Sequence, residues 1–323
     1  MGSIGSKPDL VSGFLFPRQC ILIDSIEPSS FRFLKIVQAR AKMNEEVAPN
    51  SLSEENDGET FYFPPVKTLV TRNMSLFLFD YHSIVDLFFF TVHLAHTADN
   101  VSLRASTALF EIASSEREKE KYERLMTNPG KVVKKLNEFA SVNSRNLTVT
   151  TVDTFFWFIS ASIQSAMRKR PELVKSSENL RIEDIFKFRS RKEIINYLID
   201  KKVNSLSYGG MSRIEKFIEE SLGVSLFAKD EDRQLMQLFA EVRNIHVHNR
   251  GYVNRVFLSR VQNSVPFSFE EGSRAHLRFD DLVKLTKVCV KTALELDEEI
   301  SKKFALKRKR FSTWKEEIIP ATS

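Results

Sequence analysis

The sequence predicts a mainly α protein, and three observations support that fold class. From about residue 66 onward, apolar residues recur at the spacing of three and four residues that marks one face of a helix. Glycine and proline number only ten each among 323 residues, which favours long regular elements over a turn-rich β-sandwich. Hydrophobic residues make up 42% and charged residues 28%, as is typical of a folded chain. We therefore expect a helical bundle, a helical layer packed on it and a less regular N-terminal region.

Residues 1–65 form that irregular region. The runs "RQCILIDSIEP" and "SSFRFLKIVQARAKM" mix short apolar stretches with turn residues, so short β-strands are plausible here. The run "NEEVAPNSLSEENDGET" is polar, acidic and interrupted by Pro and Gly, which predicts a loop or linker. The first residues, "MGSIGS", match the N-myristoylation pattern through Gly2 and Ser6. We interpret this short match as a chance one, and the sequence leaves acylation open.

Residues 66–149 are expected to form the helical layer. An apolar-faced helix is expected over about residues 67–98. Its Phe-rich run, residues 74–96, could be mistaken for a membrane span, but Asp80, His82, Asp86 and His93 would be costly in hydrocarbon. A buried amphipathic helix fits better, and we expect no membrane partner. A charged helical stretch follows, and we expect a break in it at residues 128–130, "NPG".

Residues 150–310 are expected to form the main helical domain, with residues 311–323 as a tail. Thr and Asp near residue 150 look like a cap signal for a helix that stops before Pro171. Ser190, with Glu193 three residues later, matches a capping box. Gly223 and Gly251 suit the ends of two further helices. The four remaining expected helices cover residues 190–210, 209–223, 230–249 and 278–306.

The charge balance favours a polyanionic partner. The net charge is +6 and the isoelectric point about 9.1, which suits RNA, although an ordinary basic protein gives the same numbers. A basic segment ends the main helical domain. Its residues Lys307, Arg308, Lys309 and Arg310 are a candidate RNA contact, or equally a solvated helix end. Two cysteines without a secretory signal predict a reducing, cytoplasmic location.

A polar cluster, "RNIHVHNRG", ends the helix that begins near Asp230. At about 100° per residue, His246 lies near Arg243 on the helix surface, three positions on. His248 lies five positions on, about 140° away, so a straight helix would not bring it to Arg243. Either the helix unwinds or a second copy of the segment supplies the partner. A cluster of this kind can also hold a turn without any catalysis.

The cluster resembles the R-x4-6-H motif of HEPN domains, which are all-α domains of bacterial toxins, defence systems and RNA-processing factors. The longer string "RNIHVHNRGYVN" is similar to the branch of RiboL-PSP-HEPN-like bacterial proteins, in which the motif continues as His-Asn-x-Gly. The resemblance implies an endoribonuclease that acts without a metal or cofactor, as a homodimer whose two motifs line one cleft. It also implies a toxin or phage-defence setting, in which an inhibitory partner protein is a further expectation.

Carried over by position, Arg243 matches the motif arginine, Asn244 its polar neighbour and His248 its histidine. His246, Asn249 and Arg250 are additional candidates. Imidazole can remove a proton from a ribose 2′-OH or return one to the leaving oxygen. A guanidinium can hold two oxygens of the charged transition state, and an Asn amide can hold the histidine ring or a phosphate oxygen. The products would be a 2′,3′-cyclic phosphate and a free 5′-OH.

Two other classes of function remain open. One is an RNA- or nucleotide-binding HEPN-like module without catalysis. The other is a structural dimerising regulator, with the polar cluster as an interface. A metal site at His93 and His96, followed by Asp99, is disfavoured because no further ligand is evident in the sequence.

Overall fold

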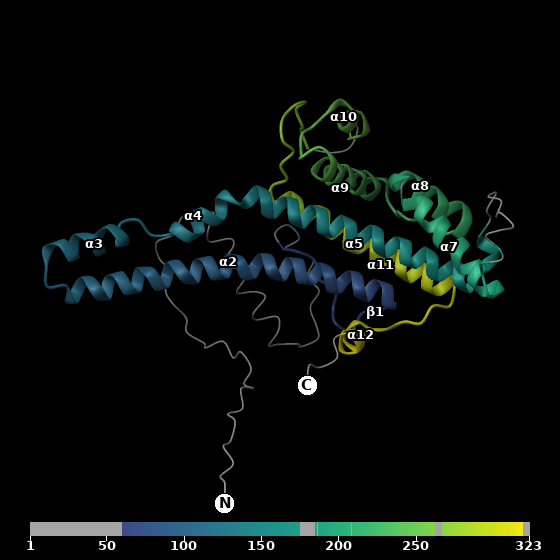
Figure 1. Ribbon diagram of the computed structural model, residues 1–323, viewed down its shortest axis with the longest axis horizontal. Helices are drawn as coiled ribbons and strands as arrows, with labels where there is room; N and C mark the ends of the chain where they lie inside the picture. The colour runs from purple at the N-terminus through teal and green to yellow at the C-terminus, as the bar shows by residue number, and fades with distance from the viewer. Residues whose placement is uncertain (1–59, 175–184, 186, 208, 262–266, 319–323) are drawn as a thin grey trace, which may run out of the picture. The chain divides into compact units, whose positions relative to one another are not determined.

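The structure, a computed structural model, describes residues 60–174, 185, 187–207, 209–261 and 267–318. These residues belong to one compact unit, Leu52–Ser323. The unit is mainly α, as predicted (Figure 1). The strands and the linker expected within residues 1–59 lie outside the described residues, and so does the myristoylation pattern.

The longest helix, α2, spans Arg72–Ile112. It begins there because the Thr71 hydroxyl accepts a hydrogen bond from the Met74 N–H (3.3 Å). The predicted end near residue 98 is wrong, because neither Gly nor Pro interrupts the chain before Ile112. Helices α3 (Glu116–Met126) and α4 (Lys131–Glu138) fold back along α2 (Figure 1). The break between them is confirmed, with Gly130 in the left-handed region at φ 79°.

Helix α5 spans Ala140–Lys169 and packs against both α2 and α11. Its predicted start near residue 150 is wrong, because the supposed cap residues lie inside the helix. The Thr154 hydroxyl donates to the Thr150 carbonyl of the same helix (2.9 Å) rather than capping an end. Helix α5 thus runs unbroken through the position predicted as a domain boundary. It stops before Pro171 as predicted, and the 3-10 helix η1 (Pro171–Leu173) follows.

Helix α7 spans Arg191–Ser207, and the Ser190 half of the predicted capping box is confirmed, whereas the Glu193 carboxylate binds the residue before the expected one. The Glu193 N–H donates to the Ser190 hydroxyl (3.2 Å), and the Glu193 carboxylate accepts from the Arg189 N–H (2.8 Å). Helix α8 (Gly210–Phe217) continues into the π-helix η2 (Ile218–Leu222). That element ends at Gly223 (φ 61°), also as predicted.

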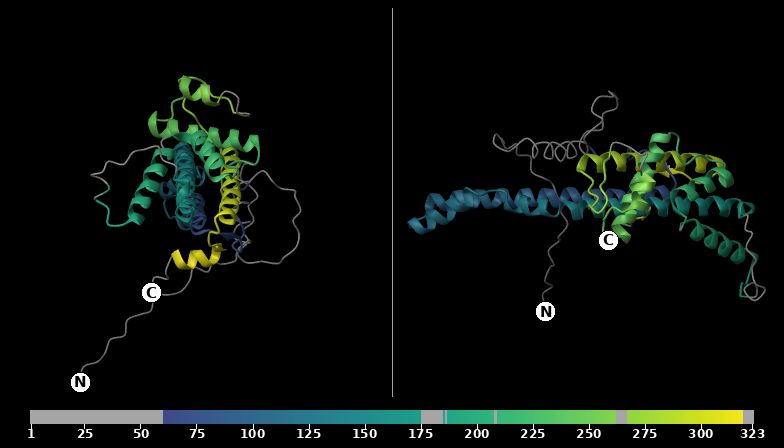
Figure 2. Two further views of the ribbon diagram at one scale, coloured as in Figure 1. Left: turned by 90° about the vertical axis from the view of Figure 1, so that its right-hand side faces the viewer. Right: turned by 90° about the horizontal axis from the view of Figure 1, so that it is seen from above.

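Helix α9 spans Asp230–His248, and α11 spans Phe279–Lys303. Both pack against α5, and the views in Figure 2 place them on neighbouring sides of it. The core among these helices contains the fully buried Phe155, Phe158 and Phe239, and the first two of these rings contact Phe77 on α2. The short helix α10 (Arg255–Val261), which the sequence pattern did not predict, packs across α9.

The C-terminal segment returns to the start of α2. Strand β2 (Lys309–Arg310) pairs antiparallel with β1 (Leu69–Val70), and α12 (Phe311–Ile318) follows. Trp314 is buried and its indole N–H donates to the Val70 carbonyl (2.8 Å), so this ring docks on the protein itself.

A buried carboxyl joins α11 to this end of α2. Asp297 accepts hydrogen bonds from the Thr71 N–H (3.0 Å) and from the Thr71 hydroxyl. Burial raises the pKa of Asp297 to about 6, and the two Thr71 hydrogen bonds and nearby Arg308 oppose that rise. The carboxyl therefore fixes the start of α2 while resisting ionisation.

Helix α2 is long and apolar enough to cross a membrane, the one such helix within the described ranges. Its first half packs in the core through residues such as Phe77 and Tyr81. From Leu87 onward the helix carries large apolar side chains that are exposed, including Leu87, Phe90, Leu94 and Val101. The expectation of a buried amphipathic helix is therefore confirmed for the part before Leu87 and wrong for much of the part after it.

Candidate functional site

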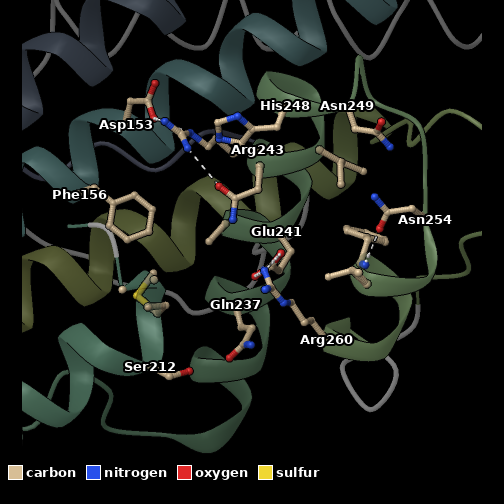
Figure 3. Close-up of a pocket in the computed structure, with 18 residues that line it drawn as sticks. Asp153, Phe156, Ser212, Gln237, Glu241, Arg243, His248, Asn249, Asn254 and Arg260 are labelled. Carbon is tan, nitrogen blue, oxygen red and sulfur yellow. Dashed lines mark hydrogen bonds and ion pairs between the residues drawn. The ribbon is translucent and has the colours of Figure 1, made fainter. Parts of the chain in front are cut away.

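A groove of about 900 Å³ contains the predicted motif (Figure 3). Helix α9 forms its floor, and α5, α8 and α10 contribute its walls. Arg243, Asn244, His248 and Asn249 all line it. Its remaining lining residues on α9 are Gln237, Ala240, Glu241 and Ile245. One chain thus brings the motif arginine and the motif histidine to the same hollow.

Arg243 is held in place at one end of this groove. Its Nε and Nη2 atoms each lie 2.6 Å from Oδ1 of Asp153 on α5. Its Nη1 donates to the Asn244 side-chain carbonyl (3.1 Å). The guanidinium side chain is 24% exposed, so the contacts fix its position without sealing it from solvent. Asn244 therefore orients the arginine, a contact that the sequence did not predict.

His248 reaches the groove although α9 stays helical to that residue. The floor follows a stripe of residues three and four apart, namely Gln237, Glu241, Asn244 and His248. Arg243 enters from the edge of the stripe on its long side chain. Figure 3 shows the imidazole and the guanidinium at the same end of the groove. The expectation that Arg243 and His248 can line one site only if the helix unwinds or a second copy supplies the partner is therefore wrong.

His246 lies outside the groove lining, on another side of α9. It packs against Gly251, where an added Cβ would stand 2.8 Å from the His246 Nδ1. Burial lowers the pKa of His246, and the charges of Arg145 and His276 lower it further. The half-buried ring favours its neutral form and fills the space beside the turn.

The residues after His248 build a tight turn. Arg250 and Gly251 both adopt left-handed backbone angles, with φ of 52° and 81°. The N–H of Gly251 donates to the Ile245 carbonyl (2.8 Å), and the Asn249 amide donates to the Tyr252 carbonyl (2.6 Å). Asn249 lines the groove and holds this turn, whereas Arg250 is exposed and outside the lining.

The other end of the groove contains residues that the sequence interpretation missed. Arg260 on α10 pairs with Glu241 on α9, with 3.2 Å between Nη1 and Oε2. Ser212 from α8 and Gln237 add a hydroxyl and an amide (Figure 3). Sequence distance hid these groups, because three separate helices supply them. Asp153 and Phe156 on α5 were missed for the same reason.

Two residues of the basic segment, residues 307–310, form contacts within the chain. Arg308 donates to the Leu69 carbonyl (2.6 Å), and Lys309 pairs with Glu317 and lies over the Trp314 ring. Lys307 and Arg310 are exposed. The structure therefore leaves two of the four predicted RNA contacts on the surface.

The pair His93 and His96 lies on α2, and Asp99 caps α4. The Asp99 carboxylate accepts from the N–H groups of Val132 (3.0 Å) and Val133 (2.9 Å). Within the described part of the chain, no three His, Cys, Asp or Glu side chains form a group that could hold a metal.

Comparisons of the chain with protein-family models, with curated proteins and with solved structures give no match. The likeness to HEPN domains therefore rests on residues Arg243 to Asn254 and on the helical fold around them.

Proposed function

We propose that the protein is a metal-independent endoribonuclease of HEPN type, active as a homodimer in the cytoplasm, in a toxin or phage-defence setting. One observation carries the proposal: Arg243, Asn244 and His248 line a single groove that is open to solvent. These are the three residues that the motif assigns to charge stabilisation, orientation and proton transfer.

The contacts of Arg243 suit the binding of a phosphate. A guanidinium carries five N–H donors, and the contacts with Asp153 and Asn244 leave one donor on each terminal nitrogen. Two phosphate oxygens can therefore be held together. In the transition state, negative charge accumulates on those oxygens, so the same donors bind more strongly there than in the ground state.

His248 is exposed at the same end of the groove and supplies the imidazole. Cleavage by a 2′-OH needs one proton removed and one returned, and one imidazole is suited to one of these transfers at a time. Among the described residues that line the groove, His248 is the only histidine. A second copy of the groove residues, brought by a partner subunit, would supply the other imidazole. This requirement supports the homodimer.

The Asp153–Arg243 ion pair favours a second candidate function, which is RNA or nucleotide binding without cleavage. The Asp153 carboxylate, 2.6 Å from the Arg243 guanidinium, already occupies some of its hydrogen-bond donors. An arginine held in this way can position a bound phosphate even where no bond is broken.

The decisive experiment measures cleavage of total RNA by the purified protein in the presence of EDTA, with mapping of the product ends. We expect 2′,3′-cyclic phosphate and 5′-OH ends. His248→Ala should reduce the rate by roughly 10²- to 10⁴-fold. His246→Ala is the matched control, because it removes the same side chain from the same helix outside the groove. Equal rates for wild type and His248→Ala, with both proteins folded, would refute the nuclease.

The homodimer is tested by mixing the wild type with an excess of His248→Ala. If the cleft needs one imidazole from each subunit, the heterodimers lack one of them, and the mixture loses activity as subunits exchange. A monomer in solution, or undiminished wild-type activity after subunit exchange, contradicts the shared cleft. RNA binding without cleavage in the wild type would support the binding module instead.

A further inference from the structure

A second hollow of about 380 Å³ lies beside the groove, between α2 and α5. It is lined by Leu76 and Asp80 from α2, and by Asp153, Thr154 and Trp157 from α5. Asp153 lines both hollows, so they meet at the residue that holds Arg243. Trp157 is 47% exposed, although tryptophan is among the side chains with the highest average burial.

We propose that the hollow beside Trp157 binds an unpaired nucleobase next to the phosphate held by Arg243, so that the substrate is single-stranded RNA. This inference rests on the proposed nuclease function. Exposed aromatic rings beside a phosphate site are how proteins bind single strands, because every base offers a face for stacking. Leu76 gives the hollow an apolar side as well.

The charges of the hollow indicate a base and not a phosphate. Asp80 and Asp153 both line it and would repel a phosphate, whereas the N–H groups of a base edge can donate to them. The cation that suits a phosphate, Arg243, lines the neighbouring groove. Phosphate and base are thus assigned to adjacent hollows.

Two consecutive aromatic residues of α5 line different hollows. Phe156 lines the groove and Trp157 lines the second hollow, and their side chains leave α5 about 100° apart. Two successive bases, each stacked on one of these rings, would be held apart and would not stack on each other. Attack by a 2′-OH requires a position in line with the leaving oxygen, which a regular base stack does not provide. Splayed bases therefore favour the cleavage reaction as well as binding.

Asp80 gives the hollow a preference among bases. An ionised carboxylate only accepts hydrogen bonds. Guanine presents an N1–H and an N2 amino group side by side, so it can donate twice to one carboxylate, while uracil offers a single N–H. We expect guanine to bind best in the wild type, and Asp80→Asn to remove most of that preference.

The first test measures binding without cleavage. A single-stranded 2′-O-methyl hexanucleotide, which lacks the attacking hydroxyl, is titrated while tryptophan fluorescence is followed. The chain has two tryptophans, and Trp314 is buried against Val70, so a change in emission reports mainly on Trp157. We expect quenching in the wild type, and its loss in Trp157→Phe. Phe90→Ala, which removes an exposed ring elsewhere on α2, is the control and should bind as the wild type does.

The second test uses deoxyoligonucleotides with a single ribonucleotide, and an abasic position on the 5′ or the 3′ side of it. At one of these positions the missing base should lower the kcat/KM of the wild type by about tenfold. The Trp157→Ala variant should show the same decrease in kcat/KM on the intact substrate, and no further decrease in kcat/KM on the abasic substrate. Trp157→Phe should retain most of the sensitivity, since it keeps a ring face.

The outcomes separate the two proposals. RNA cleavage with abasic sensitivity unchanged in Trp157→Ala overturns the base site and leaves the nuclease standing. Quenching that depends on Trp157, without cleavage of any RNA, keeps the base site and overturns the nuclease. Neither binding nor cleavage overturns both.

Discussion

The buried carboxyl of Asp297 makes a quantitative prediction about stability and pH. Its side chain is 2% exposed, and its pKa lies at about 6 in the folded protein against an ordinary value of 3.8. A raised pKa means that the folded state binds the proton more tightly than the unfolded state does. The stability that this proton contributes is therefore complete below about pH 4 and is lost as the pH rises through about 6. A difference of about two pKa units corresponds to roughly 3 kcal/mol.

The perturbation that isolates this effect is Asp297→Asn. The amide carbonyl still accepts from the Thr71 N–H, and the amide N–H can donate to the Thr71 hydroxyl oxygen, so the two contacts survive without a titrating group. We expect the unfolding free energy of the variant, relative to the wild type, to rise by up to about 3 kcal/mol from pH 4 to pH 7. All other carboxyls are present in both proteins and cancel in the difference.

Urea unfolding at pH 4, 5, 6 and 7, followed by circular dichroism, measures the difference. Urea is preferred to a guanidinium salt because it does not screen the nearby Arg308 and Glu298 charges. The control is Asp280→Asn, which changes an exposed carboxyl at the start of the same helix. Parallel curves for wild type and Asp297→Asn across this range would refute the reasoning, because they would mean that the carboxyl ionises equally well when folded.

Two further predictions concern the groove and its turn. Asp153→Asn should bind single-stranded RNA several-fold more tightly, as measured by fluorescence anisotropy, and should cleave it more slowly. The Arg243 charge is then no longer offset by a carboxylate, but the guanidinium is no longer held in position. Loss of both binding and fold would contradict this. Gly251→Ala should lower the melting temperature more than Gly272→Ala. Both glycines have φ near 80°, which costs other residues about 1–2 kcal/mol, but only at Gly251 would the new Cβ meet a side chain, that of His246. Equal decreases in melting temperature for the two variants would contradict this, because they would show that the His246 side chain moves away from the new Cβ at no cost.

Helix ends that depend on local chemistry could be predicted from the sequence. The Ser190 cap and the stops before Pro171 and at Gly223 are set by groups within a few residues, so their patterns were sufficient. The start of α5 could not be predicted in this way. Asp153 looked like a cap residue, but its partner Arg243 lies 90 positions further along the chain. A carboxylate near apolar residues has the same local pattern whether it caps a helix or pairs across the fold.

The candidate site was predicted in part. The motif residues Arg243, Asn244 and His248 do meet in one groove. The helical spacing placed His246, and not His248, beside Arg243. That argument for His246 failed because it took the Arg243 backbone position as the centre of the site. The floor of the groove follows Asn244 and His248, which are four apart, and His246 lies on another side of the helix. Which stripe of α9 stays open depends on how α5, α8 and α10 pack around it, and this packing is absent from the pattern of α9 alone.

The Asp153–Arg243 pair connects placement with affinity. Under the proposed function, a free arginine would bind the single charge of a phosphodiester strongly in the ground state, which lowers KM without raising kcat. Asp153 offsets part of that attraction and fixes the guanidinium through its Nε and Nη2 atoms. The transition state carries more negative charge on the same oxygens, so the remaining donors discriminate in its favour. A residue that weakens substrate binding can therefore increase the rate, which is why Asp153→Asn should separate RNA affinity from RNA cleavage.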